Sequence, residues 1–163
     1  MNRRSRNSIR RRAFTLVESL AVVIVLSIAV PPAVSMMVDA ARTQADSVKM
    51  TRATWFATSI LENIIADVNS DDVNLGFSAL DDSNAYLTTA TTGLNNRLSA
   101  VIAHYNGFGL THSVQIGALS ESTGAVSGTP SENVFRTITV GVTWTNMNGV
   151  SRTLNIGAVV TDL

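Results

Sequence analysis

A single carboxylate, Glu18, lies four residues after Phe14 in a run that is otherwise apolar. An ionised side chain inside a bilayer segment costs about 2.5–3.5 kcal/mol on insertion scales, so such a residue indicates function and a partner of opposite charge. The chemistry that this position offers is ion pairing. We therefore expect Glu18 to pair with a positive charge inside the membrane.

The segment after Glu18 has the length and composition of a membrane-spanning helix. No residue from 19 to 38 is charged, and about 20 apolar residues, each rising about 1.5 Å, cross a bilayer. Pro31 and Pro32 each remove a backbone donor, at about 3 kcal/mol in a helix interior. We expect a helix break, as a kink or a local opening, near residues 27–32, where Ser27 is placed to satisfy a freed carbonyl.

Basic residues are concentrated before this segment. Six of the twelve Lys and Arg side chains lie within residues 1–13, and the rest of the chain carries six basic against twelve acidic side chains, a formal charge of −6. Basic residues that flank an apolar segment stay on the cytoplasmic side, so the chain after the segment is expected outside the cytoplasm. The same position favours a topological role over nucleic-acid binding, and no nucleic-acid partner is expected.

The basic block, Ala13, Phe14-Thr15-Leu16-Val17-Glu18 and the long apolar tail together resemble the processing site of type IV pilins and type II secretion pseudopilins. The resemblance implies that a prepilin peptidase cleaves between Ala13 and Phe14 and that the new terminus at Phe14 is N-methylated. It also implies that Glu18 pairs with a terminal amine during filament assembly. The family usually has Gly before the cleavage point, so Ala13 implies slower cleavage.

The same resemblance implies a location and a set of partners. The protein would sit in the bacterial cytoplasmic (inner) membrane as a single-pass protein, with its amino terminus in the cytoplasm, and would then enter a periplasmic or surface filament. Its partners would be other pilin or pseudopilin subunits, the inner-membrane assembly platform and membrane lipid.

Other interpretations of the amino terminus stay open. An ordinary secretory signal also has a basic start and an apolar core, and Ala33-Val34-Ser35 is a small-residue cleavage site. Arg11-Arg12-Ala13-Phe14 resembles the core of a twin-arginine signal. Both signals leave Glu18 unexplained. The remaining alternative is a plain membrane anchor for an extracytoplasmic binding module.

A helical pattern continues after the apolar segment. Residues 39–68 contain no Pro or Gly, and apolar residues recur on one helical face at Ala53, Ala57, Leu61, Ile64, Ile65 and Val68. We assign Trp55 and Phe56 to packing against a globular part. Charged residues of both signs occur along this stretch and are expected to need no special partner: Arg42, Asp46, Lys49, Arg52, Glu62 and Asp67.

Residues 69–92 are polar and rich in Ser, Thr and Asn, which predicts a long surface loop. Two acidic pairs, Asp71-Asp72 and Asp81-Asp82, offer the oxygen ligands that calcium prefers. Their spacing matches no calcium-binding loop, so we interpret the stretch as a solvated loop and expect no metal.

The last 70 residues or so predict a short helix and a small sheet. A helix is expected over residues 94–105, capped by Thr91 or Thr92 and ended by Asn106-Gly107. Alternation over residues 113–118 and 137–144 predicts two strands, and Asn148-Gly149 makes a hairpin turn into a return strand from about Ser151 to Thr161. This ending resembles the closing hairpin of minor pilins and minor pseudopilins.

These elements predict an α+β, pilin-like fold in which a long N-terminal helix packs on a small C-terminal antiparallel sheet. The expected domains are a leader over residues 1–13 that is removed, a transmembrane and assembly helix over 14–38, and an extracytoplasmic globular domain over 39–163. One domain of this size has room for its own core.

Catalytic residues are not apparent in the sequence. The chain has no Cys, which excludes thiol catalysis and disulfides. His104 and His112 are not spaced as two metal ligands on one helix face, and no nucleophile motif accompanies them. We expect a non-enzymatic structural protein without a cofactor: a minor pilin or pseudopilin.

Overall fold

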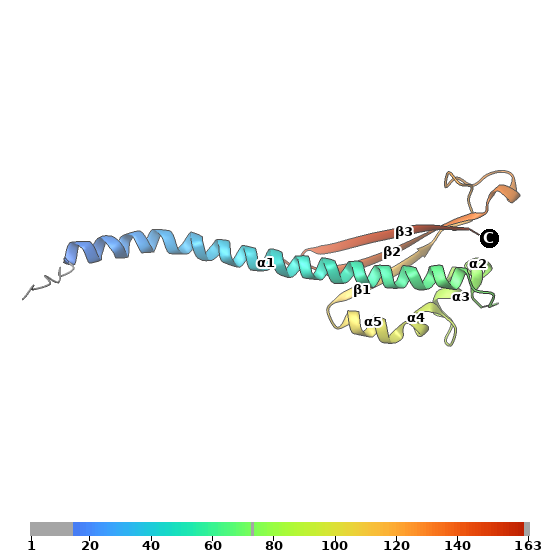
Figure 1. Ribbon diagram of the computed structural model, residues 1–163, viewed down its shortest axis with the longest axis horizontal. Helices are drawn as coiled ribbons and strands as arrows, with labels where there is room; N and C mark the ends of the chain where they lie inside the picture. The colour runs from blue at the N-terminus through green and yellow to red at the C-terminus, as the bar shows by residue number, and fades with distance from the viewer. Residues whose placement is uncertain (1–14, 73, 162–163) are drawn as a thin grey trace, which may run out of the picture. The chain divides into compact units, whose positions relative to one another are not determined.

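A computed structural model describes residues 15–72 and 74–161 (Figure 1). By its internal contacts the chain forms two compact units, Met1–Thr43 and Gln44–Leu163. The boundary between the units falls five residues after the expected end of the transmembrane segment at residue 38. The two limits differ in origin. Residue 38 comes just before Asp39, the first charged residue after the apolar run, whereas residue 43 is where the two compact units divide.

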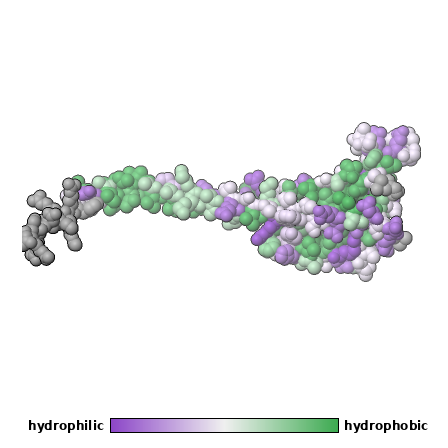
Figure 2. Space-filling view, viewed as in Figure 1, coloured by the Kyte–Doolittle hydropathy of each residue, from purple (hydrophilic) through white to green (hydrophobic). Residues whose placement is uncertain are grey.

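In the first unit, the described residues form the beginning of helix α1, which extends over Leu16–Val68. Every described residue from 15 to 43 is exposed. Large apolar side chains occur throughout this stretch, and Figure 2 shows them as a nearly continuous hydrophobic surface. A helix that is hydrophobic all round is stable only when lipid or other helices cover it.

The local opening of the helix expected near Pro31 and Pro32 is absent, because α1 continues through both residues; a kink there stays a prediction. Two adjacent prolines remove only two backbone donors, and the turns on either side stay helical. Ser27 donates its hydroxyl to the carbonyl of Val23 at 2.7 Å and Ser35 donates to that of Pro31 at 3.1 Å. Ser27 therefore does not bond a carbonyl that the prolines free. Opening of this segment in an assembled filament stays a prediction.

In the second unit, the rest of α1 buries one face and exposes the other. Six residues of this helix are buried: Ala53, Phe56, Ala57, Ile60, Ile64 and Asp67. The assignment of Phe56 to the core is confirmed, but that of Trp55 is wrong, since its side chain is 67% exposed. Adjacent helical residues point about 100° apart, so a core that holds Phe56 leaves Trp55 outside.

The predicted sheet is confirmed as three antiparallel strands in the order β1 (Leu110–Ile116), β2 (Phe135–Thr145) and β3 (Ser151–Thr161). Val140 of the central strand pairs with Val114 on one side and with Ile156 on the other. The inward residues of β2 follow the predicted alternation and are buried: Ile138, Val140, Val142 and Trp144. With α1, this sheet gives the expected α+β layout.

The long loop expected over residues 69–92 is wrong. Two short helices form there, α2 (Gly76–Ala79) and α3 (Ser83–Thr88). Leu80 and Tyr86 are buried in the core, and Asp82 caps α3 by accepting a hydrogen bond from the backbone of Ala85 at 2.9 Å. Burial of two large side chains among polar neighbours orders a stretch that composition alone describes as a loop.

The helix expected over residues 94–105 is divided at Leu98 into α4 (Leu94–Arg97) and α5 (Ser99–Asn106). The end at Asn106 is confirmed, but the N-cap is Gly93 and neither predicted threonine caps α4 with its side chain. A short 3-10 helix, η1 (Pro130–Glu132), lies in the connection from β1 to β2.

The core of the second unit joins these elements in one cluster. Phe56 is fully buried and stacks on Tyr105 of α5 with the ring centroids 4.4 Å apart. His112 of β1 meets the same ring edge-on at 5.6 Å. Phe56 therefore connects α1 with both the helical layer and the sheet.

Candidate functional site

Glu18 lies in the first turn of α1, where the side chain of Thr15 caps its backbone N–H. The backbone N–H of Glu18 donates to the hydroxyl of Thr15 at 3.3 Å, and that of Ser19 donates to the carbonyl of Thr15 at 3.1 Å. Thr15-x-x-Glu18 has the sequence of a capping box, in which Ser or Thr bonds the N–H three residues later. A carboxylate also suits the positive end of the helix dipole.

This capping role was missed by our sequence reasoning, although Ser/Thr-x-x-Glu before an apolar run is its known signal. It explains why Thr15 and Glu18 favour a helix start here. It does not neutralise the carboxylate, because no ion pair of Glu18 occurs among the residues that the structure describes. The predicted cleavage pair, Ala13 and Phe14, lies outside the described residues.

The surroundings of Glu18 are apolar. With Ala21, Val22, Val25 and Leu26, it lines an open hollow of about 280 Å³ on the surface of α1. A small side chain beside larger ones allows another helix to approach closely. The local geometry can therefore accept an apolar helix and, beside it, a cation for the carboxylate.

Within the described residues, α1 is the one helix long and apolar enough to cross a membrane, and its apolar window has no buried residue. This supports a single-pass membrane anchor close to the amino terminus. Side chains from Leu16 to Val38 supply the surface that lipid or neighbouring helices would cover.

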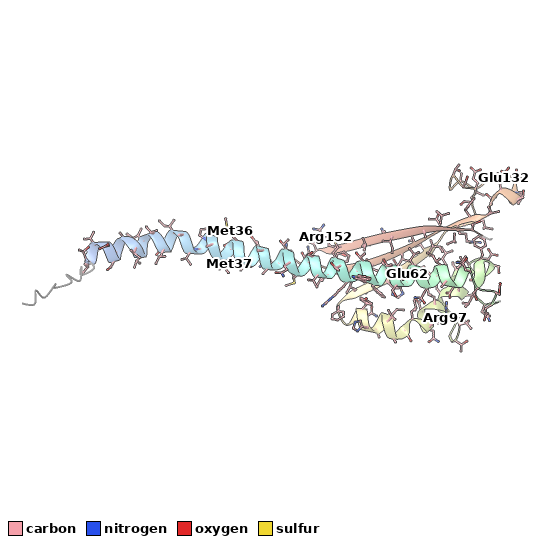
Figure 3. All side chains as sticks on the ribbon, in the orientation of Figure 1. Met36, Met37, Glu62, Arg97, Glu132 and Arg152 are labelled. Atoms are coloured by element: carbon pink, nitrogen blue, oxygen red, sulfur yellow. The ribbon has the colours of Figure 1, made fainter. Side chains whose placement is uncertain are left out.

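The charged residues of the second unit include a buried cluster that sequence reasoning missed. Asp67, expected to need no partner, is only 6% exposed. Its Oδ1 accepts from Arg97 at 2.8 Å, its Oδ2 forms an ion pair with the same guanidinium, and Tyr86 donates its hydroxyl to Oδ2 at 2.5 Å (Figure 3 labels Arg97). Burial, and then the bond to Asp67, raise the pKa of Tyr86, so its phenol stays protonated.

A second ion pair, between a buried arginine and an exposed aspartate, involves one of the two acidic motifs. Arg136 of β2 is buried, pairs with Asp81 and donates to the carbonyl of Gly117 at 3.1 Å. Asp82 is the cap of α3, and Asp72 accepts from the backbone of Asn74 at 2.8 Å. Asp72, Asp81 and Asp82 therefore have structural partners, and the described residues hold no cluster of three potential metal ligands.

The two histidines lie apart in different surroundings. His112 is half-buried in β1, where its Nε2 is 3.0 Å from Oδ1 of Asn95, and burial lowers its pKa. His104 is exposed on α5 beside the rings of Tyr105 and Phe108. Among the described contacts, neither histidine meets a serine and a carboxylate as a catalytic triad requires.

Fold and site together define a class of protein: an α+β chain with one apolar N-terminal helix that suits a single-pass membrane anchor and a small antiparallel sheet, a layout compatible with a pilin-like shape. Comparison with protein-family models, curated proteins and solved structures finds no match to the chain.

Proposed function

We propose that this protein is a structural subunit, a minor pilin or pseudopilin, of a type IV pilus or type II secretion pseudopilus. The observation that carries the proposal is the first part of α1. It exposes apolar side chains on all sides and carries one carboxylate, Glu18, near its start. A plain anchor needs the apolar surface but has no use for the carboxylate.

Assembly in this proposal follows from lateral packing of apolar helices. Small residues such as Ala21, Ser27 and Ala29 allow close approach, as small residues do in membrane helix interfaces. The carboxylate of Glu18 is neutralised by the terminal amine of Phe14 from its own or an adjacent subunit. Correct axial register is favoured because a slipped helix leaves a buried charge without a partner.

The proposal includes processing and partners. A prepilin peptidase removes residues 1–13, the amine of Phe14 is methylated, and the platform in the inner membrane adds the subunit to a filament with other pilin-like chains. The second unit then lies outside the cytoplasm, because the basic residues before α1 stay inside. No reaction is catalysed by the subunit itself.

The first test is the intact mass and amino-terminal sequence of the protein purified from the membranes of its native cells. A chain that begins with N-methylated Phe14 supports the pilin pathway. A start at Met1 favours a plain anchor instead. A start near Met36 means that Glu18 belongs to a discarded signal, and the filament proposal is then wrong.

The second test is Glu18→Ala, for which we expect normal membrane insertion and loss of incorporation into filaments. Insertion is kept because removing a charge makes the segment more apolar. Glu62→Ala, which removes an exposed carboxylate from the second half of α1 (Figure 3), is the matched control and should leave incorporation unchanged. Normal filaments that contain the Glu18→Ala chain would contradict the assembly role.

A further inference from the structure

Strand β3 forms one border of the sheet and is long and regular (Figure 1). It pairs with β2 over 11 consecutive residues, Ser151–Thr161, and the register has no bulge along this length. Natural edge strands are usually short, or carry Pro, Lys or a bulge that prevents pairing with another chain. β3 contains neither Pro nor Lys. This border of the sheet therefore lacks the usual protection.

Hydrogen bonds at the end of the sheet show which backbone groups of β3 point outward. Phe135 of β2 exchanges two hydrogen bonds with Ser120, at 2.8 and 3.0 Å, and Thr137 accepts one from the residue after β1, Gly117, at 2.8 Å. The odd-numbered residues of β2 thus face the β1 side. Backbone direction alternates along a strand, so the even-numbered residues of β2 bond their partners in β3, which are also even-numbered. The odd-numbered residues of β3 therefore direct their N–H and C=O groups to the free border.

Four residues in the middle of this border present such groups: Thr153, Asn155, Gly157 and Val159. All four are exposed. In the described part of the chain, β2 is the one strand that pairs with β3, so the outward N–H and C=O groups of these residues have no partner strand. An extended backbone bonds a row of this kind in full, and the border is therefore a template for one more strand.

The side chains along β3 define the strand that fits. On the core face, Leu154, Ile156 and Ala158 are only partly buried, which leaves apolar surface at the margin of the core. On the other face, Thr153 and Asn155 are exposed and polar. A segment that alternates apolar and polar residues covers this apolar surface and keeps its own polar side chains in water.

The charge along the border favours a segment of another protein. Arg152, labelled in Figure 3, is the one charged residue of β3, is exposed, and forms no salt bridge with a described residue. A carboxylate directly opposite on an added strand would complement it. None of the three described strands contains Asp or Glu. A strand from a second copy of this chain therefore cannot supply that carboxylate.

We propose that the free border of β3 binds an extended segment of another protein as a fourth strand of the sheet. The segment runs antiparallel to β3, the more stable pairing per residue. It alternates apolar and polar residues and carries a carboxylate opposite Arg152. The inference rests on the second unit alone and goes beyond the proposed filament function.

The first test measures binding of a fluorescein-labelled peptide, Thr-Val-Thr-Val-Thr-Val-Thr-Glu, to the full-length protein in detergent by fluorescence anisotropy. In the antiparallel register its Glu lies opposite Arg152, its Thr residues bond β3 and the N–H groups of its Val residues point away. One control peptide is N-methylated at the three inner Thr residues and another at the three Val residues. We expect the first modification to weaken binding at least about tenfold, because it removes hydrogen bonds to β3, and the second to leave binding unchanged.

The second test changes the protein. Asn155→Pro removes one outward N–H and no bond to β2, a change that edge strands tolerate, and should weaken peptide binding at least about tenfold. Asn155→Thr keeps the N–H and is the matched control, and an unchanged thermal transition shows that each variant is folded. Arg152→Glu should weaken binding of the original peptide and restore binding of a peptide that ends in Lys.

Two outcomes overturn the proposal. One is absence of peptide binding, or equal binding of the original peptide and both N-methylated peptides. This result does not depend on whether Asn155→Pro folds. The other is a cross-linked dimer of the parent chain that the folded Asn155→Pro variant does not form, because the occupant of the border is then a second copy of the chain.

Discussion

The two halves of α1 share one backbone conformation and differ in what surrounds them. From Leu16 to Thr43 no described residue is buried, whereas the second half buries Phe56 and Ile64 and exposes Trp55 and Glu62. The first half has an apolar surface that no described residue of its own unit covers, and the second half packs on the sheet of its own unit. The difference teaches that helix formation alone does not distinguish the two halves, whereas burial separates an exposed apolar surface from a core.

The comparison predicts the largest effect on stability for a buried residue in the second half of α1. Phe56→Ala should lower the free energy of unfolding of the second unit by about 4 kcal/mol, because it removes a fully buried ring and leaves a cavity. Trp55→Ala, one residue away and exposed, should change it by less than about 0.5 kcal/mol. Urea unfolding in detergent, followed by the fluorescence of the buried Trp144, measures both.

A control substitution in the first half of α1 tests whether the two halves of the helix unfold separately. Val25→Ala alters only the exposed apolar surface of α1 and should leave the same urea transition unchanged. A shift as large as that of Phe56→Ala would mean that the two halves unfold as one unit, contrary to the comparison.

The next largest effect is expected at the buried charge of the second half. Asp67→Ala should lower the free energy of unfolding by about 3 kcal/mol, because it leaves the guanidinium of Arg97 and the hydroxyl of Tyr86 without their acceptor. Glu62→Ala, on the exposed side of the same helix, should have little effect. Comparable losses in the two variants, measured by urea unfolding, would show that the cluster contributes no more than a surface charge.

A smaller effect on stability is expected in the turn between β2 and β3, where the backbone N–H of Met147 bonds Asp46 of α1. Gly149 has φ +78° and open space around it, so Gly149→Ala meets only backbone strain and should cost about 1 kcal/mol. Gly128 also has open space but no positive φ, and Gly128→Ala should cost nothing measurable. Thermal unfolding of both variants by circular dichroism tests this, and equal melting temperatures would contradict it.

The smallest effect is a pH dependence from His112, which lies against Phe56 of the second half. Burial lowers the pKa of His112 in the folded chain, so below about pH 6.5 the unfolded state binds the proton more readily. Stability should therefore fall as the pH drops from about 6.5 toward the folded pKa. His112→Gln should remove this part of the pH dependence of the melting temperature, and His104→Gln should retain it.

Sequence patterns predicted the elements in which one periodicity dominates. The alternation of Ile138, Val140 and Val142 gave the buried face of β2, and Asn148-Gly149 gave the hairpin turn. The end of α5 at Asn106 was predicted from Asn106-Gly107, a pair that typically ends helices. In each case, the signal is local, so neighbouring residues in the chain are sufficient to predict it.

The errors occurred where a distant partner decides the outcome. Asp67 looks like one more surface charge until Arg97, thirty residues later, folds against it. Trp55 has the residue type of a core position, but its angular position on α1 leaves its side chain exposed to solvent. Leu80 and Tyr86 order a polar stretch because they reach the common core. Composition and periodicity cannot register contacts of this kind.

The candidate assembly site was predictable in type but not in detail. The isolated Glu18 and its apolar neighbours were apparent from sequence, and the structure places them together on an exposed helix surface. The bond from Glu18 to Thr15 was predictable from the Thr-x-x-Glu motif and was overlooked. Cleavage and methylation at Phe14 stay predictions.

The hydrogen bond between Asp46 and Met147 joins residues 101 positions apart, so it forms only late in biosynthesis. At roughly 5–20 residues per second, the ribosome needs about 5–20 s to make the turn after it has made its partner on α1. During that interval the second half of the helix has no sheet to cover Phe56 and Ile64. An amphipathic helix next to a bilayer finds cover for its apolar face at the lipid interface. For a membrane-anchored chain, we therefore expect the bilayer to cover the apolar face of this helix until the sheet is complete.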